Sequence, residues 1–213
     1  MSSITKITVG GALVALISFG SPANASNVGV QPVDFANPAF APVTGPTSIP
    51  MGAAQFCRDN RNDCLPDSRM VPVETLTNKS WQQLTAVNDS VNRNIIPETD
   101  EQLYHVAEYW TYPTKGAGDC EDIALEKRKQ LIAAGWDEST LLMTVVRERD
   151  GEGHAVLMVR TDRGDLILDN QAAQILVWNQ TPYEYIKRQS QSDAGKWVGL
   201  NDDRTTVITA ATN

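Results

Sequence analysis

A chain of 213 residues, 41% of them hydrophobic, can bury one sizeable core and falls within the usual range of a single domain. Its formal net charge is −8 at pH 7, so it lacks the basic surface that nucleic-acid binding requires and would be repelled by an anionic bilayer. We therefore expect neither nucleic acid nor an anionic membrane surface as a partner. The acidic balance is compatible with a protein that meets divalent cations.

The N-terminus has the pattern of an export signal. Lys6 precedes an apolar run from Ile7 to Phe19, and Ala23-Asn24-Ala25 follows as a small-residue cleavage site. The alternative is a membrane anchor, but the run is shorter than the roughly 20 residues that a span requires. We expect a signal peptide at residues 1–25, and removing it takes the formal charge to −9. The mature protein is then expected in the periplasm, without stable membrane insertion.

The next segment has the composition of a disordered arm. Residues 26–50 carry prolines among small residues and show no hydrophobic period. We expect the folded domain over residues 51–203 and a C-terminal tail over residues 204–213.

Two of the three cysteines are close in sequence. Cys57 and Cys64 flank a polar, turn-rich segment, and in an oxidising compartment we expect them to form a disulfide. Closing so short a loop is worth only about 2 to 3 kcal/mol in the chain-entropy model, so the bridge fixes a surface loop. A metal site is the weaker interpretation, because no further Cys or nearby His completes four ligands. Cys120 is then an unpaired thiol, which in an oxidising compartment is expected either to be buried or to have a chemical function.

An amphipathic helix is predicted before the third cysteine. Its apolar positions have helical spacing, and the pattern ends before Pro97. We expect this helix to pack beside the one that begins at Cys120. The positions are Trp81, Leu84, Val87, Val91 and Ile95.

Cys120 lies between a glycine-containing turn and a helical pattern that continues to Gly135. Asp119 suits the N-cap, and Asp122, three residues on, approximates a capping box. In the first turn of a helix the free amides and the positive end of the dipole favour the thiolate, which is the reactive form of cysteine. Cys120 is therefore the candidate nucleophile, and a buried, inert cysteine is the alternative.

Three carboxylates flank this thiol. Asp119, Glu121 and Asp122 form a local negative cluster that should raise the pKa of the cysteine. They either complement the helix dipole or bind Ca²⁺, which prefers oxygen ligands and whose charge would reverse the local field. The three residues are the candidate metal ligands.

The chain has two histidines from which to choose a general base. His105 lies in an ambiguous stretch and is expected to pack or cap. His154 follows a glycine turn and opens the strand-like run from Ala155 to Arg160, which is preceded by another strand over residues 141–148. A histidine at the mouth of a strand would be both held and exposed, so His154 is the candidate base.

Asp169 ends an otherwise apolar strand. It could accept the ring N–H of His154 and fix its tautomer, as the third member of a triad does, or it could be a turn residue. If Arg163 and Gly164 form a tight two-residue loop, Asp169 lies opposite Met158, about 13 Å along the strand from His154. The triad then requires a wider turn, a bulge or strong shear.

The end of the predicted domain adds a short helix over residues 182–189 and a last strand over residues 197–200.

An acyl transfer also requires donors for the oxyanion. The backbone N–H of Cys120 is a natural donor because it lies at a helix start. Trp110 and Tyr112 are candidates for a second donor, although aromatic residues there more often pack against the core.

The order Gly118-Asp119-Cys120-Glu121-Asp122, then a His-led strand, then Asp169-Asn170 after the next strand resembles the bacterial transglutaminase-like cysteine proteinases, which include the LapG-type periplasmic proteases. The resemblance extends over residues 56–200. It implies an α+β, papain-like or transglutaminase-like fold with the nucleophile at a helix N-terminus packed on an antiparallel sheet. It also implies a triad of Cys120, His154 and Asp169.

The resemblance further implies calcium dependence, with Asp119 and Glu121 among the ligands. Its implied substrate is a large surface adhesin, cut near its N-terminus at a site with paired alanines, and its implied regulator is an inner-membrane receptor that senses cyclic-di-GMP. We therefore expect an exported cysteine endopeptidase. The alternatives are a protein-crosslinking transglutaminase, in which an amine replaces water, and a non-catalytic, calcium-stabilised binding module.

Overall fold

The computed structural model describes residues 38–67 and 69–204. The chain divides into two units, Met1–Gln31, which lies outside the described residues, and Pro32–Asn213, whose described part follows. The predicted signal peptide and the tail beyond residue 204 therefore lie outside the described residues. Within the described part, no helix has the length and apolar character needed to cross a bilayer.

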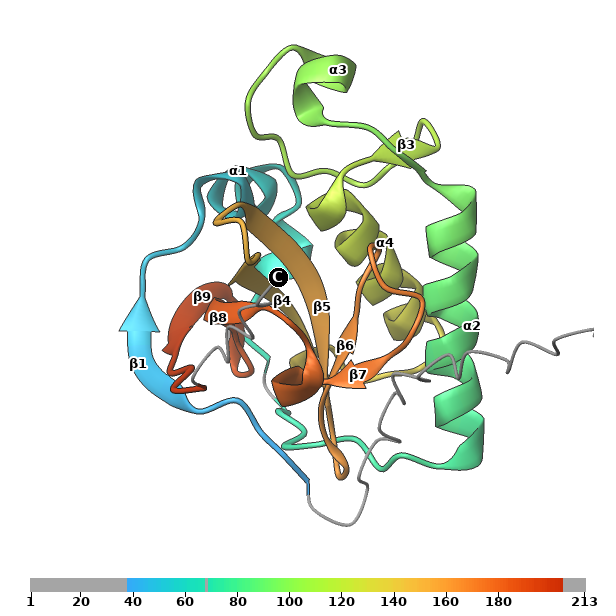
Figure 1. The fold of residues 1–213 in the computed structure, drawn as a ribbon, viewed down its shortest axis with the longest axis vertical. Helices are drawn as coiled ribbons and strands as arrows, with labels where there is room; N and C mark the ends of the chain where they lie inside the picture. Colours follow the sequence, from blue (N-terminus) through green and yellow to red (C-terminus); the bar gives the residue numbers. More distant parts are fainter. Residues whose placement is uncertain (1–37, 68, 205–213) are drawn as a thin grey trace, which may run out of the picture. The chain divides into compact units, whose positions relative to one another are not determined.

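A seven-stranded antiparallel sheet forms the centre of the fold (Figure 1). Its strand order is β1-β9-β8-β4-β5-β6-β7. The central strands β4 and β5 are buried along nearly their whole length, which indicates that both faces of the sheet are covered there. The strands are β1 Val43–Thr47, β4 Leu141–Arg147, β5 Gly153–Thr161, β6 Gly164–Leu168, β7 Leu176–Val177, β8 Glu184–Ser190 and β9 Asp193–Leu200.

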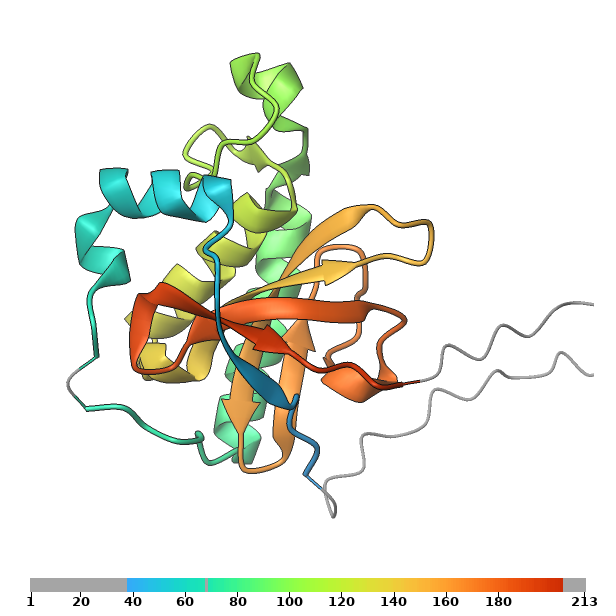
Figure 2. The same ribbon diagram turned by 90° about the vertical axis from the view of Figure 1, so that its left-hand side faces the viewer.

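Two long helices form a layer beside this sheet. Helix α4, Cys120–Ala133, packs against β4 and β5, and helix α2, Asn78–Asn94, packs against α4 (Figures 1 and 2). Both helices were predicted, and Leu84 and Val91 of α2 are buried, as their spacing indicated. Two shorter α-helices are α1, Met51–Asp59, and α3, Asp100–Tyr104.

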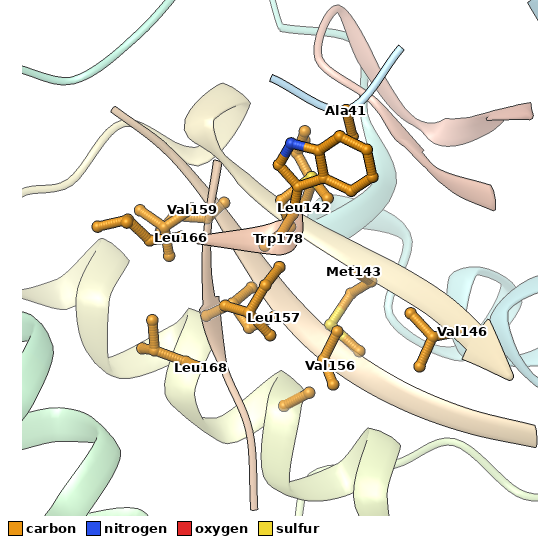
Figure 3. Close-up of a cluster of buried hydrophobic side chains, with 14 of the residues drawn as sticks. Ala41, Leu142, Met143, Val146, Val156, Leu157, Val159, Leu166, Leu168 and Trp178 are labelled. Atoms are coloured by element: carbon orange, nitrogen blue, oxygen red, sulfur yellow. The ribbon is translucent and has the colours of Figure 1, made fainter. Parts of the chain in front are cut away.

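The buried apolar cluster joins the central strands to the segments that cover them (Figure 3). Burying one large aliphatic or aromatic side chain contributes about 1.5 to 3 kcal/mol, so this cluster is the main source of stability for the unit. It also holds β5 and β6 in fixed register, and these two strands lead to the predicted base and its carboxylate. Labelled members are Ala41, Leu142, Met143, Val146, Val156, Leu157, Val159, Leu166, Leu168 and Trp178.

A second, two-stranded parallel sheet connects α2 to α4. It consists of β2, Ile96–Pro97, and β3, Ala117–Gly118. The N–H of Ile96 donates to the carbonyl of Gly116 at 2.9 Å, and the N–H of Glu98 donates to the carbonyl of Gly118 at 3.2 Å. This pairing brings the start of α3 beside the start of α4, although the two lie about twenty residues apart in sequence.

The loop between β5 and β6 differs from the predicted one. Thr161 pairs with Gly164, so the two-residue loop is Asp162 and Arg163 rather than Arg163 and Gly164. Gly164 is the first strand residue, with φ of 108°, and a Cβ there would lie 2.6 Å from the carbonyl oxygen of Ala39. Glycine is required here because the backbone is left-handed and lies close to Ala39 at the start of β6, and not because the residue belongs to the loop.

This shift changes the predicted distance between base and carboxylate. Leu157 pairs with Leu168 at the end of β6, so the next position, Asp169, lies opposite Val156. Val156 is two residues from His154 and on the same face of β5, about 7 Å along the strand. Because Asp169 follows the last paired residue, it can turn toward the histidine, and no wider turn, bulge or extra shear is required.

Two predicted segments are wrong. Residues 182–189 were expected to form a helix, but β8 runs through Glu184–Ser190 and pairs with β4 and β9, where its β-favouring Tyr185 and Ile186 fit a half-buried surface. The prediction that residues 26–50 are disordered is wrong for the part of this segment that the structure describes, because β1 pairs with β9. As an edge strand, β1 tolerates the proline at position 46. The predicted last strand, residues 197–200, is confirmed within β9.

The disulfide between Cys57 and Cys64 is present and leaves Cys120 as a free thiol. The bridge joins the end of α1 to the 3₁₀ turn Arg61–Cys64. It therefore fixes a local loop, as its short sequence separation of 7 indicated.

Candidate active site

Cys120 is the first residue of α4, and its sulfur lies against the start of β5. The backbone N–H of Ala155 donates to Sγ at 3.4 Å, and the thiol donates to Oε2 of Glu121 at 3.1 Å. A Cβ on Gly118 would lie 2.7 Å from the Asp122 side chain, so only glycine permits this tight approach to the helix. The candidate nucleophile therefore contacts the residue that follows the candidate base.

The surroundings of the sulfur oppose its ionisation. Burial, and then the charge of Glu121 and its hydrogen bond, raise the pKa of the Cys120 thiol well above its ordinary value. The helix N-terminus acts in the opposite direction, because its free amides favour an anion. The carboxylates beside the thiol therefore need a compensating charge before the reactive thiolate can form easily.

His154 and Asp169 form a buried hydrogen-bonded pair. Nε2 of His154 lies 2.9 Å from Oδ1 of Asp169, and the histidine is 3% exposed. Oδ1 also accepts the backbone N–H of Gln171 at 2.9 Å, and Oδ2 accepts the hydroxyl of Tyr183. Burial would raise the pKa of Asp169, but the hydrogen bonds from His154, Tyr183 and Gln171 outweigh it and hold that pKa below its usual value. Asp169 is therefore the anionic, fixed partner of the imidazole.

The hydrogen bond between Nε2 of His154 and Asp169 leaves Nδ1 as the ring nitrogen for proton transfer. Because Nε2 is engaged by Asp169, proton exchange with the thiol of Cys120 would use Nδ1. Nδ1 lies 4.0 Å from Oε1 of Glu148, and the thiol is directed toward Glu121. Completing the predicted triad requires the thiol to leave Glu121 and approach Nδ1.

A group of three carboxylates includes both chain neighbours of Cys120. One carboxylate oxygen each from Asp100, Asp119 and Glu121 lies within 4.8 Å of the others. Asp100 is the first residue of α3, which is capped by Thr99 and brought here by the β2–β3 pairing. Asp100 was not predicted from the sequence, whereas Asp119 and Glu121 were.

Each carboxylate of this group has one buried oxygen without a donor among the described residues. Oδ1 of Asp100, Oδ1 of Asp119 and Oε1 of Glu121 are buried and have no hydrogen-bond partner within the described part of the chain. Burial, followed by the charge of Asp119, raises the pKa of Glu121 to about 9. Burial likewise raises the pKa of Asp100 to about 6 and raises the pKa of Asp119 above its usual value. A divalent cation with a preference for oxygen ligands would satisfy all three groups.

Comparison with known proteins decides the family. The chain matches the bacterial transglutaminase-like cysteine proteinase family over residues 43–205, which is more than half of its length. The chain belongs to this family. Its α+β, papain-like fold, with the cysteine at the start of a helix packed on an antiparallel sheet, agrees with the fold class that the sequence predicted. A search of curated proteins finds no match.

Solved structures with a similar arrangement include Legionella pneumophila LapG. Its calcium-bound form is 25% identical to this proteinase over 59% of this chain and 71% of that chain, with a TM-score of 0.49. Its EGTA-treated form is 26% identical over 59% of this chain and 69% of that chain, with a TM-score of 0.47.

Asp122, the third predicted metal ligand of the proteinase, lies outside the group of three carboxylates. Its Oδ1 accepts the backbone N–H of Thr111 at 2.8 Å, while Oδ2 is buried without a partner in the described residues. Burial raises its pKa to about 8. The predicted capping box does not form, because the side chain of Asp119 makes no cap hydrogen bond and that of Asp122 ties the preceding loop to the helix.

The two aromatic candidates for a second oxyanion donor are engaged elsewhere. The indole N–H of Trp110 donates to Glu108 at 2.6 Å, and the hydroxyl of Tyr112 donates to Asp63 at 2.8 Å. Both side chains pack against other segments, which was the alternative interpretation. Cys120 is the first residue of α4, so its backbone N–H belongs to the first turn of the helix and stays the predicted oxyanion donor.

His105, the other histidine, ends α3 in a left-handed conformation with φ of 58°, so it caps, as expected.

Two further residues contact the His154–Asp169 pair, and the sequence indicated neither of them. The amide of Asn92, from α2, donates to the carbonyl of Asp169 at 2.8 Å, and the ring of Tyr183 lies 5.3 Å from that of His154. The sequence predicts a helix over residues 182–189, and no local pattern places Tyr183 near the histidine.

Proposed function

We propose that this proteinase is an exported cysteine endopeptidase in which Cys120 is the nucleophile, His154 the general base and acid, and Asp169 the residue that orients the imidazole. The observation that carries the proposal is the 2.9 Å hydrogen bond between His154 and Asp169, made while the sulfur of Cys120 lies against the residue next to the histidine. A nucleophile, a base and an orienting carboxylate in this order are the parts that acyl transfer requires.

The chemistry proceeds through a thioester. The sulfur of Cys120 attacks the carbonyl carbon of a peptide bond while its proton passes to Nδ1 of His154. The tetrahedral oxyanion is stabilised by the backbone N–H of Cys120 at the start of α4. Collapse of this intermediate breaks the C–N bond, and His154 returns the proton to the leaving amine. Water, deprotonated by His154, then hydrolyses the thioester and restores the thiol.

Calcium fits the carboxylate group. Asp100, Asp119 and Glu121 would hold the ion through oxygens that are now buried without donors, with Oδ2 of Asp122 available as a further ligand. A bound Ca²⁺ supplies positive charge beside the sulfur and so offsets the carboxylates that disfavour the thiolate. In the loaded protein, Glu121 would be drawn toward the ion and away from the thiol, which frees the thiol for Nδ1 of His154.

The substrate, location and regulator are proposed from the family resemblance. The substrate is a protein, a large surface adhesin cut near its N-terminus at paired alanines. The signal-like residues 1–25 support a periplasmic location. The proposed regulator is an inner-membrane receptor that responds to cyclic-di-GMP and sequesters the proteinase.

The direct test incubates the mature protein with adhesin fragments, with calcium or with a chelator. We expect cleavage with calcium, little cleavage with chelator, and none by Cys120→Ala. The two histidines give a matched pair: His154→Ala should lower the cleavage rate by about a thousandfold or more, whereas His105→Ala should not change it.

The outcomes separate the rival functions. Cleavage by Cys120→Ala would reject the nucleophile, and cleavage unaffected by chelator would reject a catalytic need for calcium. A glutamine donor and a primary amine are supplied in parallel, and a crosslink in place of cleavage would indicate a transglutaminase. If Cys120→Ala retains the biological function of the protein, the chain is a binding module.

A further inference from the structure

The carboxylate of Asp169 is held by donors on both of its oxygens. Oδ1 receives His154 and the N–H of Gln171, while Oδ2 receives the hydroxyl of Tyr183. Tyr183 also packs its ring against the imidazole, with centroids 5.3 Å apart and an angle of 54° between the planes. One side chain, 8% exposed, therefore contacts both proposed partners of the nucleophile.

We propose that Tyr183 is a positioning residue of the catalytic centre, which acts through Asp169 by fixing Oδ2 so that Oδ1 remains directed at Nε2 of His154. The inference rests on the proposed roles of Cys120, His154 and Asp169. A hydrogen bond to an ionised acceptor is stronger than one between neutral groups, and two donors on opposite oxygens prevent rotation of the carboxylate. A carboxylate fixed in this way keeps the imidazole in the tautomer that accepts a proton at Nδ1.

The phenol stays protonated in this position. Burial, and then its hydrogen bond to Asp169, raise the pKa of Tyr183 above its usual value. Tyr183 therefore acts as a hydrogen-bond donor and not as a base. The hydrogen bonds of the sulfur within the described residues go to Glu121 and Ala155 and not to Tyr183, so the effect of Tyr183 on Cys120 passes through Asp169 and His154.

The backbone that carries Tyr183 is itself fixed. Arg204 donates to the carbonyls of Tyr183, Thr181 and Trp178, the last two at 3.1 and 3.3 Å. Its guanidinium also pairs with Asp202 at 2.6 Å, and Asp202 accepts the N–H of Tyr185 at 2.9 Å. The segment after β9 therefore holds the turn before β8 from both sides of Tyr183.

A substitution that removes only the hydroxyl separates positioning from packing. Tyr183→Phe keeps the ring, so the fold and the contact with the imidazole are retained. Tyr185→Phe is the matched control, because Tyr185 is 1% exposed and its hydroxyl lies 3.0 Å from Thr181 rather than at Asp169. Both variants lose one buried hydrogen bond, and thermal unfolding of each confirms that they fold.

We expect Tyr183→Phe to lower kcat about 10- to 100-fold with KM within twofold of the parent, since it loses a hydrogen bond to a charged group but no substrate contact. The second-order rate constant for alkylation of Cys120 by iodoacetamide at one fixed pH and calcium concentration should fall as well. Tyr185→Phe should leave both rates within twofold of the parent. Equal rates for the parent and Tyr183→Phe would overturn the proposal.

A double-mutant cycle tests the route of the effect. In an Asp169→Ala background, adding Tyr183→Phe should change neither kcat nor the alkylation rate. A further loss of the same factor would show that Tyr183 acts independently of Asp169 and would overturn the proposal. Alkylation requires no peptide substrate, so this test still measures the coupling if Cys120→Ala cleaves and the proposed function fails.

Discussion

Two carboxylate environments flank Cys120, and they differ in their donors. Asp169 is buried, but hydrogen bonds reach both of its oxygens and hold its pKa below the usual value. Asp100, Asp119 and Glu121 are also buried or half-buried, yet each has an oxygen without a donor, and their pKa values are raised. Burial alone does not decide the charge of a carboxyl group. The first site is organised as an anion by the protein itself, whereas the second requires protons or a cation.

The largest expected effect comes from removing the anion that the protein organises. Asp169→Asn should lower kcat by about 10³- to 10⁴-fold, because an amide cannot support the positive imidazole and favours the wrong tautomer. Asp162→Asn, a partly exposed carboxyl in the β5–β6 loop, is the matched control and should leave kcat unchanged. Steady-state cleavage measures both. A loss of less than tenfold in Asp169→Asn would remove Asp169 from the triad.

The second environment should respond to calcium. Saturating calcium is expected to raise the Tm of the parent by about 5 to 10 °C, as for a ligand present at about 100 times its Kd. Asp100→Asn removes one of three ligands and should lose more than half of this rise. Glu101→Gln, its exposed neighbour in α3, should keep it. Thermal unfolding with and without calcium gives the comparison, and an unchanged rise in Asp100→Asn would place the ion elsewhere.

Stability should also depend on pH in the calcium-free protein. The folded-state pKa values of Asp100, Asp122 and Glu121, about 6, 8 and 9, lie above their unfolded values near 4, so the folded state retains protons that the unfolded chain releases. Stability from these groups is present at low pH and is lost as pH rises through the folded-state values. Burial lowers the pKa of Lys127 to about 7, so this group increases the stability of the folded state as pH rises, but only above about pH 7.

The window between pH 5 and pH 7 therefore isolates the carboxyl groups. We expect the Tm of the calcium-free protein to fall by about 3 °C or more across it, and that of the calcium-loaded protein to change little, because the ion replaces the protons. Thermal unfolding at the two pH values measures this difference. A Tm that rises with pH in the calcium-free protein would show that these carboxyl groups are ionised at pH 5.

The sequence was informative where a local pattern determined the structure. The glycine turn and the apolar period placed Cys120 at a helix start, and the strand that begins beside His154 was predicted with the strand before it. These features depend on neighbours within a few residues. The sequence did not indicate the strand within the predicted arm, because β1 is stabilised by pairing with β9, 150 residues or more away in sequence, and not by its own composition.

Parts of the site depended on contacts that no local pattern records. Asp100 is brought to Asp119 and Glu121 by two two-residue strands, which are too short to give a periodic signal. Its place after a capping threonine resembles an ordinary helix start. Tyr183 lies before β8, and the sequence of this segment predicts a helix in place of the strand. The register of β5 and β6 was missed because Gly164 was assigned to the loop, whereas its backbone freedom is used at the close approach to Ala39.

Asp122 provides the smallest and most discriminating test, because it combines features of both environments. One of its oxygens accepts the N–H of Thr111, as in a satisfied carboxylate, and the other is buried without a donor. Asp122→Asn keeps an oxygen for Thr111 and removes only the charge, so we expect the calcium-induced rise in Tm to shrink by less than about 2 °C. If more than half of the rise is lost, as expected for Asp100→Asn, then Oδ2 of Asp122 is a full ligand and the ion lies closer to α4 than the group of three carboxylates indicates.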